Sequence, residues 1–357
     1  RNEQAMVHAA AGFGKTSLLN QWQHALSAEG HRPAWLTLEP SDQDPVRLLI
    51  YIAAALARTD AELGVILAKL IQTERYLSAE VMITSLVNLL GETDSPLFLL
   101  LDDVHVLEPI AQATLSRLIE RAPANLHFIL ATRTLLPFNL SKWRTQGQLF
   151  ELDASDLRFT ADEVAVFFHY SNCSDLSIEH LTAIEERTEG WAAGLKLASI
   201  LLKRENATQH SLASFSGGHS AVADFFADEV LASQSAEIRD FLLFTAPLGR
   251  FCPELCAAVT ESPDARQLIN RIEASGLFLQ RLDDQRQWYR YHHLFADFLQ
   301  RHLHEQHPDA QTKIFSKAST WFQERSAFIE AIDYALKAGE HRQAAQILDA
   351  CCLDMSY

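Results

Sequence analysis

Residues 8–22 read HAAAGFGKTSLLNQW, and this stretch decides the fold of the first part of the chain. It contains Gly14-Lys15-Thr16, the end of the phosphate-binding pattern G-x-x-x-x-G-K-[ST], although Ala9 stands where the pattern has its first glycine. An apolar run precedes the loop, as in a strand, and apolar residues follow it at helical spacing. The first glycine makes little phosphate contact, so alanine is tolerable there if its φ is negative. The stretch therefore predicts a P-loop.

Each residue type in this loop suits one part of a bound nucleotide. Gly12 and Gly14 stand where backbone approaches phosphate and a Cβ would be in the way. Lys15 reaches the β- and γ-phosphates, and the hydroxyl of Thr16 coordinates Mg²⁺. Consecutive N–H groups at the start of the helix wrap the β-phosphate. The expected nucleotide-binding residues of the loop are Ala11, Gly12, Phe13, Gly14, Lys15, Thr16 and Ser17.

A second motif lies in residues 96–107, PLFLLLDDVHVL. A buried strand that ends in Asp102-Asp103 delivers carboxylates to the carboxyl edge of a parallel sheet, where ligands bind. Asp102 would hold Mg²⁺ through water, and Asp103 would polarise an attacking water. Such a strand is weak evidence alone, but at this distance from a P-loop it is strong. The candidate catalytic residues are Asp102 and Asp103, and the candidate metal ligands are Thr16 and Asp102.

A third motif is HFILATRT, residues 127–134, which predicts another strand. Arg133 follows that strand, and from there a guanidinium can sense a γ-phosphate. The alternative is a surface arginine that caps the strand.

The first part of the chain alternates short apolar runs with amphipathic stretches, which is the βαβ signature of a parallel sheet. The expected strands are residues 5–8, 34–38, 97–101, 127–131 and 149–152. We therefore expect an α/β P-loop NTPase domain over residues 1–155.

Later residues have helical patterns. Thr160 and Glu163 form a capping-box pattern, and Gly190 interrupts the helices that follow. The Ser- and Gly-rich residues 211–221 indicate a linker. Two β-rich runs flank residues 283–285 and predict a hairpin, and helices followed by such a hairpin are typical of a winged-helix domain.

The last fifty residues predict two amphipathic helices around Gly339, similar to a tetratricopeptide (TPR) pair. One pair cannot bury its own apolar face, so we expect further repeats beyond it in a longer protein. The expected domains after the P-loop domain are a helical domain over 156–215, a winged-helix domain over 216–303, and a helical pair leading into TPR-like sensor repeats over 304–357.

Bulk composition narrows the class of protein. The net charge of −16 disfavours a grip on nucleic acid by this part of the chain. No apolar run approaches the roughly 20 residues of a membrane span, and the start lacks a signal-peptide pattern, so we expect a cytoplasmic protein without membrane contact. Five cysteines without a C-x-x-C pair favour buried thiols over disulfides or a zinc site, although Cys252 and Cys256 would be one helical turn apart.

Six segments occur in an order that is specific to one family. They are AGFGKTSLLNQW, AWLTLEPSDQDPVRLLIYIAAAL, LFLLLDDVHVL, ATRTLLPFNLSKWRTQGQLFELDASDLRFTADEV, GWAAGLKLA and GLFLQRLDDQRQWYRYHHLFADFL. In these segments the chain resembles the MalT-like STAND ATPases, the large LuxR-family transcriptional activators. The resemblance covers essentially the whole chain. Such proteins commonly have a small residue other than glycine at the position of Ala9.

The resemblance implies roles for single positions. Gly12, Gly14, Lys15 and Thr16 match its Walker A motif, Asp102 and Asp103 its Walker B motif, and Arg133 its sensor-1 arginine. His292 resembles the winged-helix histidine that touches the β-phosphate of ADP in the closed state. The alternative is a core histidine between Tyr291 and Phe295, while His293 is expected at a surface or interface. Trp191 stands where relatives pack a Gly-x-Pro on the base, and without the proline its contact with a base is a guess.

The resemblance implies a slow ATPase that acts as a switch, with ATP or ADP and Mg²⁺ as cofactors. ADP would hold the resting, closed state, and ATP would favour opening and homo-oligomerisation. A small-molecule or protein inducer would bind downstream repeats, and promoter DNA would bind a C-terminal domain outside this chain. The segment before the P-loop, which in the family helps to form the adenine pocket, would also lie outside it.

Three alternatives stay open. The same switch is fused in some regulators to a Ser/Thr kinase. A P-loop phosphotransferase or motor ATPase would need a second substrate site or robust turnover. A scaffold with a vestigial site is disfavoured by the presence of Lys15, Thr16 and Asp102.

Overall fold

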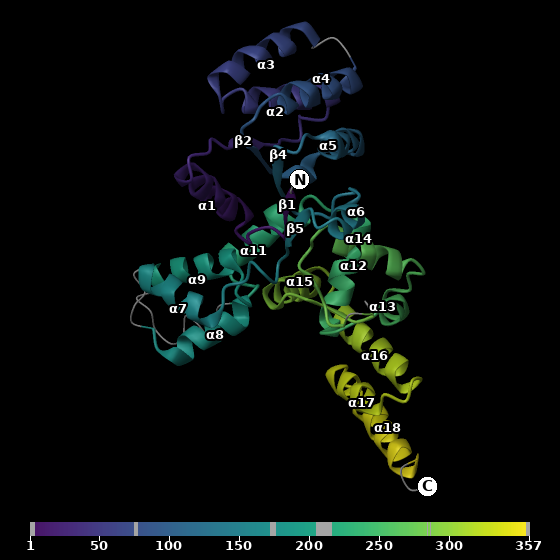
Figure 1. Ribbon diagram of the computed structural model, residues 1–357. Helices are drawn as coiled ribbons and strands as arrows, with labels where there is room; N and C mark the ends of the chain where they lie inside the picture. The colour runs from purple at the N-terminus through teal and green to yellow at the C-terminus, as the bar shows by residue number, and fades with distance from the viewer. Residues whose placement is uncertain are drawn as a thin grey trace. The chain divides into compact units, whose positions relative to one another are not determined.

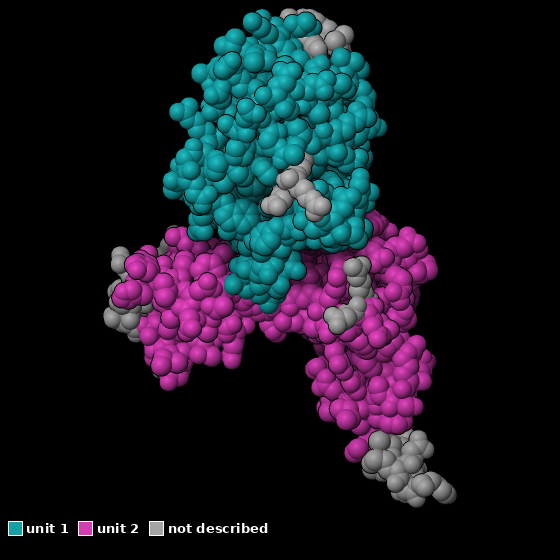
Figure 2. Space-filling model, viewed as in Figure 1, with its two compact units in different colours: residues 1–158 teal, residues 159–357 magenta. Residues whose placement is uncertain are grey.

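The computed structural model describes residues 4–74, 78–171, 176–204, 216–283, 285 and 287–354. The chain divides into two compact units, Arg1–Arg158 and Phe159–Tyr357 (Figure 2). A parallel sheet belongs to the first unit and a small antiparallel hairpin to the second. The domain limits expected within the second unit stay predictions.

The first unit is built on a five-stranded sheet of order β2-β3-β4-β1-β5, in which all the pairings are parallel. Its strands are β1 (Gln4–His8), β2 (Ala34–Thr37), β3 (Leu97–Asp102), β4 (Leu126–Thr132) and β5 (Leu149–Leu152). Each expected strand is present, with bounds within one residue of those expected. The predicted α/β P-loop fold is confirmed.

The central strands are apolar on both faces because helices cover both. Along β3, Leu99 and Leu101 join one apolar cluster, while Leu100 between them joins the cluster on the other face. Along β4, Phe128 belongs to the first of these clusters and Ile129 to the second. This alternation follows from the two-residue period of a strand. It explains why β3 is an unbroken apolar run rather than an alternating one.

Helices connect the strands of the first unit (Figure 1). They are α1 (Lys15–Ala28), α2 (Pro45–Leu56), α3 (Ala61–Glu74), α4 (Ala79–Gly91), α5 (Pro109–Arg121) and α6 (Leu140–Thr145), with a 3₁₀ turn, η1 (Val104–Val106). Helices α2, α3 and α4 all lie between β2 and β3 in the sequence and pack on one another. Because the strands are parallel, the loops that leave β1, β3 and β4 meet at one edge of the sheet.

The second unit is mostly helical. Its elements are α7 (Ala161–Tyr170), α8 (Ile178–Thr188), α9 (Ala192–Arg204), α11 (Ser220–Phe226), the π-helical η2 (Ala227–Leu231), α12 (Ala236–Thr245), η3 (Ala246–Leu248), α13 (Pro253–Thr260), α14 (Ala265–Ala274), β6 (Leu279–Arg281), β7 (Tyr289–Tyr291), α15 (His293–Gln306), α16 (Ala310–Gln323), α17 (Phe328–Lys337) and α18 (His341–Asp354). The predicted capping box is present at α7, where Glu163 N donates to Thr160 Oγ1 and Thr160 N donates to the Glu163 carboxylate.

Strands β6 and β7 form the predicted antiparallel hairpin. Asp283 fixes its turn by accepting hydrogen bonds from the N–H groups of Gln287 and Trp288, while Asp284 lies outside the described residues. Phe251 pairs with Tyr289 on the other side of β7 through two backbone hydrogen bonds of 2.9 and 2.8 Å. The hairpin and the helices before it confirm the winged-helix part of the fold.

The predicted C-terminal helical pair is also present, as α17 and α18 on either side of Gly339. Cys252 and Cys256 are buried free thiols, as expected, and burial raises the pKa of both. Side chains of the other three cysteines lie outside the described residues. Within the described part of the chain, no helix has the length and apolar character that crossing a membrane requires.

The expected linker at residues 211–221 is partly wrong. Residues 211–215 lie outside the described residues, but α11 already begins at Ser220. Gly217 lies so close to α15 that an added Cβ would be 1.9 Å from Leu294 O and 2.5 Å from Phe298 N. Arg301 Nη1 also donates to Gly218 O at 2.6 Å. Glycine is therefore needed here for close packing and not for flexibility.

We expect Gly217→Ala to lower the free energy of unfolding by about 2–3 kcal/mol, because the added methyl group meets rigid backbone of α15. Gly91→Ala in α4 is the matched control, since its Cβ would make an ordinary 3.6 Å contact with Pro123. Thermal and urea unfolding of both variants measures the difference. A Gly217 variant as stable as the wild type would contradict the close approach.

Candidate functional site

The loop between β1 and α1 has the backbone of a phosphate-binding loop. Gly12 and Gly14 have left-handed φ angles of 74° and 83°, and Gly14 directly precedes α1. Only glycine adopts such angles without strain. Ala9 does not have a positive φ, which meets the condition for alanine at that position, and its N–H donates to Thr132 O at 3.2 Å. The loop is thereby fastened to the end of β4.

Lys15 is buried at the base of this loop, with 6 % of its surface exposed. Its Nζ donates hydrogen bonds to the carbonyl oxygens of Ala9 and Ala10, at 2.8 and 2.9 Å. Burial, together with the charge of Arg133, lowers the pKa of Lys15 to about 8. A buried cation whose hydrogen bonds go to carbonyl oxygens is well placed to gain from an anion.

The P-loop and β3 meet through one side-chain hydrogen bond. Thr16 Oγ1 donates to Asp102 Oδ2 at 2.8 Å, across 86 residues of sequence. Asp103 N donates to the other carboxylate oxygen, Oδ1, at 3.0 Å. Asp102 is 2 % exposed, and burial raises its pKa although the bond from Thr16 opposes this. The hydroxyl and the carboxylate predicted as metal ligands therefore lie side by side.

This pair fits a Mg²⁺–nucleotide complex. Among the described residues, no group of three His, Cys, Asp or Glu side chains could hold a metal ion by itself. Mg²⁺ does not need one, because it keeps several waters and binds one or two protein oxygens together with substrate phosphates. Thr16 and Asp102 would supply those protein oxygens, and the first N–H groups of α1 have no acceptor within the helix.

Arg133 directly follows β4 and is half-buried. Its charge lowers the pKa of both Lys15 and His105, so it lies near them at the same edge of the sheet. Both readings of Arg133, as a phosphate sensor and as a strand cap, stay predictions.

Sequence reasoning missed three polar residues at this edge. His105 Nδ1 lies 3.6 Å from Asp103 Oδ1, and burial, Arg133 and Lys15 together lower the pKa of His105 to about 4. His8 ends β1, and burial followed by Lys15 lowers its pKa as well. Gln43 bridges the loop after β2 to the loop after β3, through Val106 O and Glu108 N. The histidine in DDVHVL, three residues after Asp102, was the available signal.

His292 lies in the second unit, directly before α15, and is 1 % exposed. Its Nε2 is 2.8 Å from the carbonyl oxygen of Thr188 at the end of α8. Its ring contacts Trp191 and Phe278, at centroid distances of 5.8 and 6.0 Å. Within this unit His292 is therefore packed in the core, as the alternative expected, although its ring neighbours differ from those expected. Its contact with a phosphate stays a prediction.

Trp191 is fully buried, and its ring packs on Phe225, Phe226 and Phe278 as well as on His292. An indole covered in this way offers no face to a base. The guess that Trp191 contacts the base is wrong for this structure.

Glu189 joins the end of α8 to the winged helix. It has a left-handed backbone with φ of 48°, and its side chain is 8 % exposed. Its carboxylate accepts hydrogen bonds from Gln280 at 2.7 Å, from both terminal nitrogens of Arg290 at 3.1 and 3.0 Å, and from His293 N at 3.1 Å. Burial would raise the pKa of Glu189, but His292 and these donors lower it to about 2.

We expect Glu189→Gln to destabilise the second unit by about 2 kcal/mol at neutral pH, because it leaves Arg290 without its buried counter-charge. The pKa of Glu189 in the folded protein lies below the ordinary value of 4.5. Its contribution to the stability of the fold is therefore complete above pH 4.5 and is lost as the pH falls towards 2. The thermal midpoint of the wild type should therefore fall more steeply below about pH 4.5 than that of the variant.

Glu237→Gln is the control, because Glu237 forms an exposed 2.7 Å pair with Arg271. It should change stability by less than about 1 kcal/mol. Parallel pH profiles of the wild type and the Glu189 variant would contradict the role of this carboxylate.

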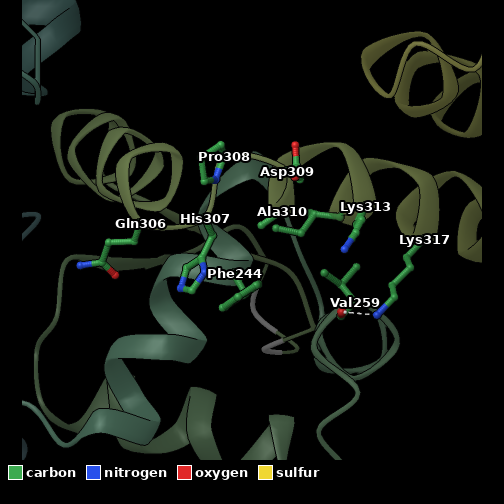
Figure 3. A pocket seen from close by; sticks show the side chains of 10 residues that line it. Phe244, Val259, Gln306, His307, Pro308, Asp309, Ala310, Lys313 and Lys317 are labelled. Atoms are coloured by element: carbon green, nitrogen blue, oxygen red, sulfur yellow. Dashed lines mark hydrogen bonds between the residues drawn. The ribbon is translucent and has the colours of Figure 1, made fainter.

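A hollow of about 420 Å³ lies beside the start of α16 (Figure 3). It is lined by Phe244, Val259, Gln306, His307, Pro308, Asp309, Ala310, Lys313, Ile314 and Lys317. Lys317 is already engaged by Val259 O, drawn as a dashed line, and by Glu261. None of the residues predicted for the site lines this hollow.

The chain is similar to proteins of two kinds. Residues 227–311 match the family described as the MalT winged helix domain. A serine/threonine-protein kinase PknK of Mycobacterium tuberculosis is 30% identical over 350 residues, which are 98% of this chain and 32% of the kinase. An HTH-type transcriptional regulator MalT of Serratia proteamaculans is 31% identical over 299 residues, 83% of this chain and 33% of the regulator. The MalT of Klebsiella pneumoniae is 28% identical over 346 residues, 96% and 38% of the two chains.

Among solved structures, the Walker-type ATPase PABY2304 of Pyrococcus abyssi matches with a TM-score of 0.58 and 14% identity. The match covers 84% of this chain and 91% of that one, and it shows the fold alone. The chain spans about a third of the length of the curated relatives.

Proposed function

Because the chain belongs to the MalT-like STAND ATPases, we propose that it is the ATP- and ADP-controlled switch of a signalling protein. In this proposal it is closed with ADP at rest, and open and self-associating with ATP. The observation that carries the proposal is the hydrogen bond between Thr16 and Asp102, which joins a P-loop to the acidic end of β3. A vestigial site would not be expected to retain this pair beside a buried lysine at the base of the loop.

The roles of the residues follow from their chemistry. Lys15 and the loop N–H groups would hold the phosphates, and Thr16 with Asp102 would hold Mg²⁺, which neutralises phosphate charge. Asp103 would orient the water that takes up the terminal phosphoryl group, giving ADP and inorganic phosphate. Arg133 would sense the third phosphate. Slow hydrolysis would then return the switch to its resting state.

The relatives point to two outputs for the same module. Those called MalT are HTH-type transcriptional regulators, and those called PknK are serine/threonine-protein kinases. We favour promoter control through a C-terminal DNA-binding domain, because the winged-helix region matches the MalT family. A kinase fusion is the second candidate, and the PknK match over 98% of the chain supports it. In both, an inducer would bind repeats that follow α17 and α18, in the cytoplasm.

The first test is to denature the purified protein and identify any released nucleotide by chromatography. We expect about one ADP per chain, because ADP would hold the resting state. Lys15→Ala should weaken ADP and ATP binding by about 10–100-fold, since it removes a charged hydrogen-bond donor. Lys69→Ala on the exposed face of α3 is the control. Unchanged affinity in the Lys15 variant would remove the P-loop assignment.

A second test concerns His292, for which we propose a contact with the β-phosphate of ADP. His292→Phe keeps a ring against Trp191 and Phe278 but removes the nitrogens, so ADP should dissociate about 10-fold faster while ATP is little affected. Phe295→Leu disturbs the same aromatic cluster without changing His292. Equal acceleration by both variants would assign His292 to packing.

A further inference from the structure

The hollow beside the start of α16 has the size of a ligand site. Its volume of about 420 Å³ falls within the range of roughly 300–1,000 Å³ that is usual for small-molecule sites. It lies where α12, α13 and α16 pack together, with the turn between α15 and α16 at one end. All of its lining residues belong to the second unit, so it is a feature of that unit alone.

The inner wall of the hollow is apolar. Val259 of α13 and Ile314 of α16 are 4% and 3% exposed, and Phe244 near the end of α12 is half-buried. The ring of His307 packs on Phe244 at a centroid distance of 5.5 Å and continues this wall. Water makes few hydrogen bonds to such a surface, so its displacement by an apolar group is favourable.

Two lysines lie one turn apart at the rim of the hollow, and they differ in their partners. Lys317 Nζ donates to Glu261 at 2.7 Å and to Val259 O at 3.1 Å, so its charge is matched within the protein. Among the residues that the structure describes, the ammonium group of Lys313 has neither a hydrogen-bond acceptor nor an ion pair. Lys313 is therefore the cation that a ligand can use.

The side chains around Lys313 leave its charge available. In Figure 3 its Nζ points to the same side of α16 as the imidazole of His307, towards Phe244. The carboxylate of Asp309, at the start of the same helix, points to the opposite side. A free cation beside an apolar wall is also a local exception in a chain whose net charge is −16. These features together are complementary to a molecule with an apolar body and one negative charge.

We propose that this hollow binds a small organic acid, whose aliphatic or aromatic body lies against the apolar wall and whose carboxylate pairs with Lys313. A carboxylate fits better than a phosphate ester, because one lysine matches a single negative charge. A phosphate group carries a charge near −2 and offers three acceptor oxygens, which one free lysine does not satisfy. This inference goes beyond the proposed function and does not require that the first unit binds a nucleotide.

The position of the hollow gives the bound acid an effect on packing. Val259 lies on α13 and Ile314 on α16, so the acid would contact both helices at once. Helix α16 packs in turn on α17, where Ser319 Oγ donates to Ala331 O at 2.7 Å. The acid would therefore stabilise the packing of the winged-helix core on the helical pair that follows it, and it should raise the thermal midpoint of the second unit.

Binding is tested by titrating the whole chain with hexanoate, benzoate and 4-phenylbutyrate, using calorimetry and ligand-observed NMR. The three corresponding amides have the same bodies without the charge, and acetate and inorganic phosphate are anions without the apolar body. We expect at least one acid to bind, with about one molecule per chain. Its amide should bind about 10–100-fold more weakly, as expected for loss of a hydrogen bond between charged groups. Acetate and phosphate should also bind more weakly than that acid.

Two variants assign the binding to this hollow. Lys313→Met removes the cation from an exposed position, so the acid should bind about 10-fold more weakly. Ala310→Phe places a ring in the hollow and should abolish binding while Lys313 stays in place. Lys196→Met on the exposed face of α9 is the matched control and should leave the affinity for the acid unchanged. Thermal unfolding of each variant without ligand shows whether it is folded, and Lys313→Met decides if Ala310→Phe is not.

Four results would overturn the proposal. They are the absence of binding by all three acids, binding of the amide as tightly as the acid, binding of acetate or phosphate as tightly as the acid, and an affinity that Lys313→Met leaves unchanged. Each of them leaves the proposed function standing, because that is decided by the nucleotide that the first unit binds. A chain that binds the acid through Lys313 but binds no nucleotide would have the opposite meaning.

Discussion

The rest of the first unit depends on the parallel pairing that brings β1, β3 and β4 to one edge of the sheet. That arrangement lets Thr16, at the start of α1, donate to Asp102 across 86 residues of sequence. The same edge receives Lys15, Arg133 and His105, and burial together with the charge of Arg133 lowers the pKa values of Lys15 and His105. The pairing of the strands therefore decides which charged side chains share this edge.

Much of this fold was predictable from sequence because its signals are local. The apolar run of β3 reports a strand covered on both faces, and Gly14-Lys15-Thr16 reports a loop whose backbone angles only glycine adopts easily. The capping box at Thr160 and the hairpin of β6 and β7 were predicted for the same reason. In each case a few adjacent residues set the backbone, and distant contacts only reinforce it.

The parts that sequence missed depend on residues brought together by tertiary structure. Glu189 looks like a surface glutamate at the end of a helix, and only its contacts with Gln280 and Arg290 make it a buried anion. Gly217 looks like a linker residue until α15 is seen against it. The periodicity of a sequence does not show which residues from distant segments come together, because a glutamate or a glycine is compatible with a surface position as well as with a buried one. The expectation for Trp191 failed for a different reason. Its position in the family motif suggested a contact with the base, but aromatic side chains pack against its ring in the structure.

The contact between Glu189 and Arg290 has a consequence for synthesis of the chain. The two residues are 101 positions apart, so Arg290 does not exist when α8 and Trp191 leave the ribosome. At typical elongation rates of about 5–20 residues per second, the delay is about 5–20 s. The first unit can complete its sheet during that interval, whereas the apolar surface around Trp191 stays exposed to solvent. Nascent chains of this protein should therefore engage chaperones chiefly through the segment between Trp191 and β7.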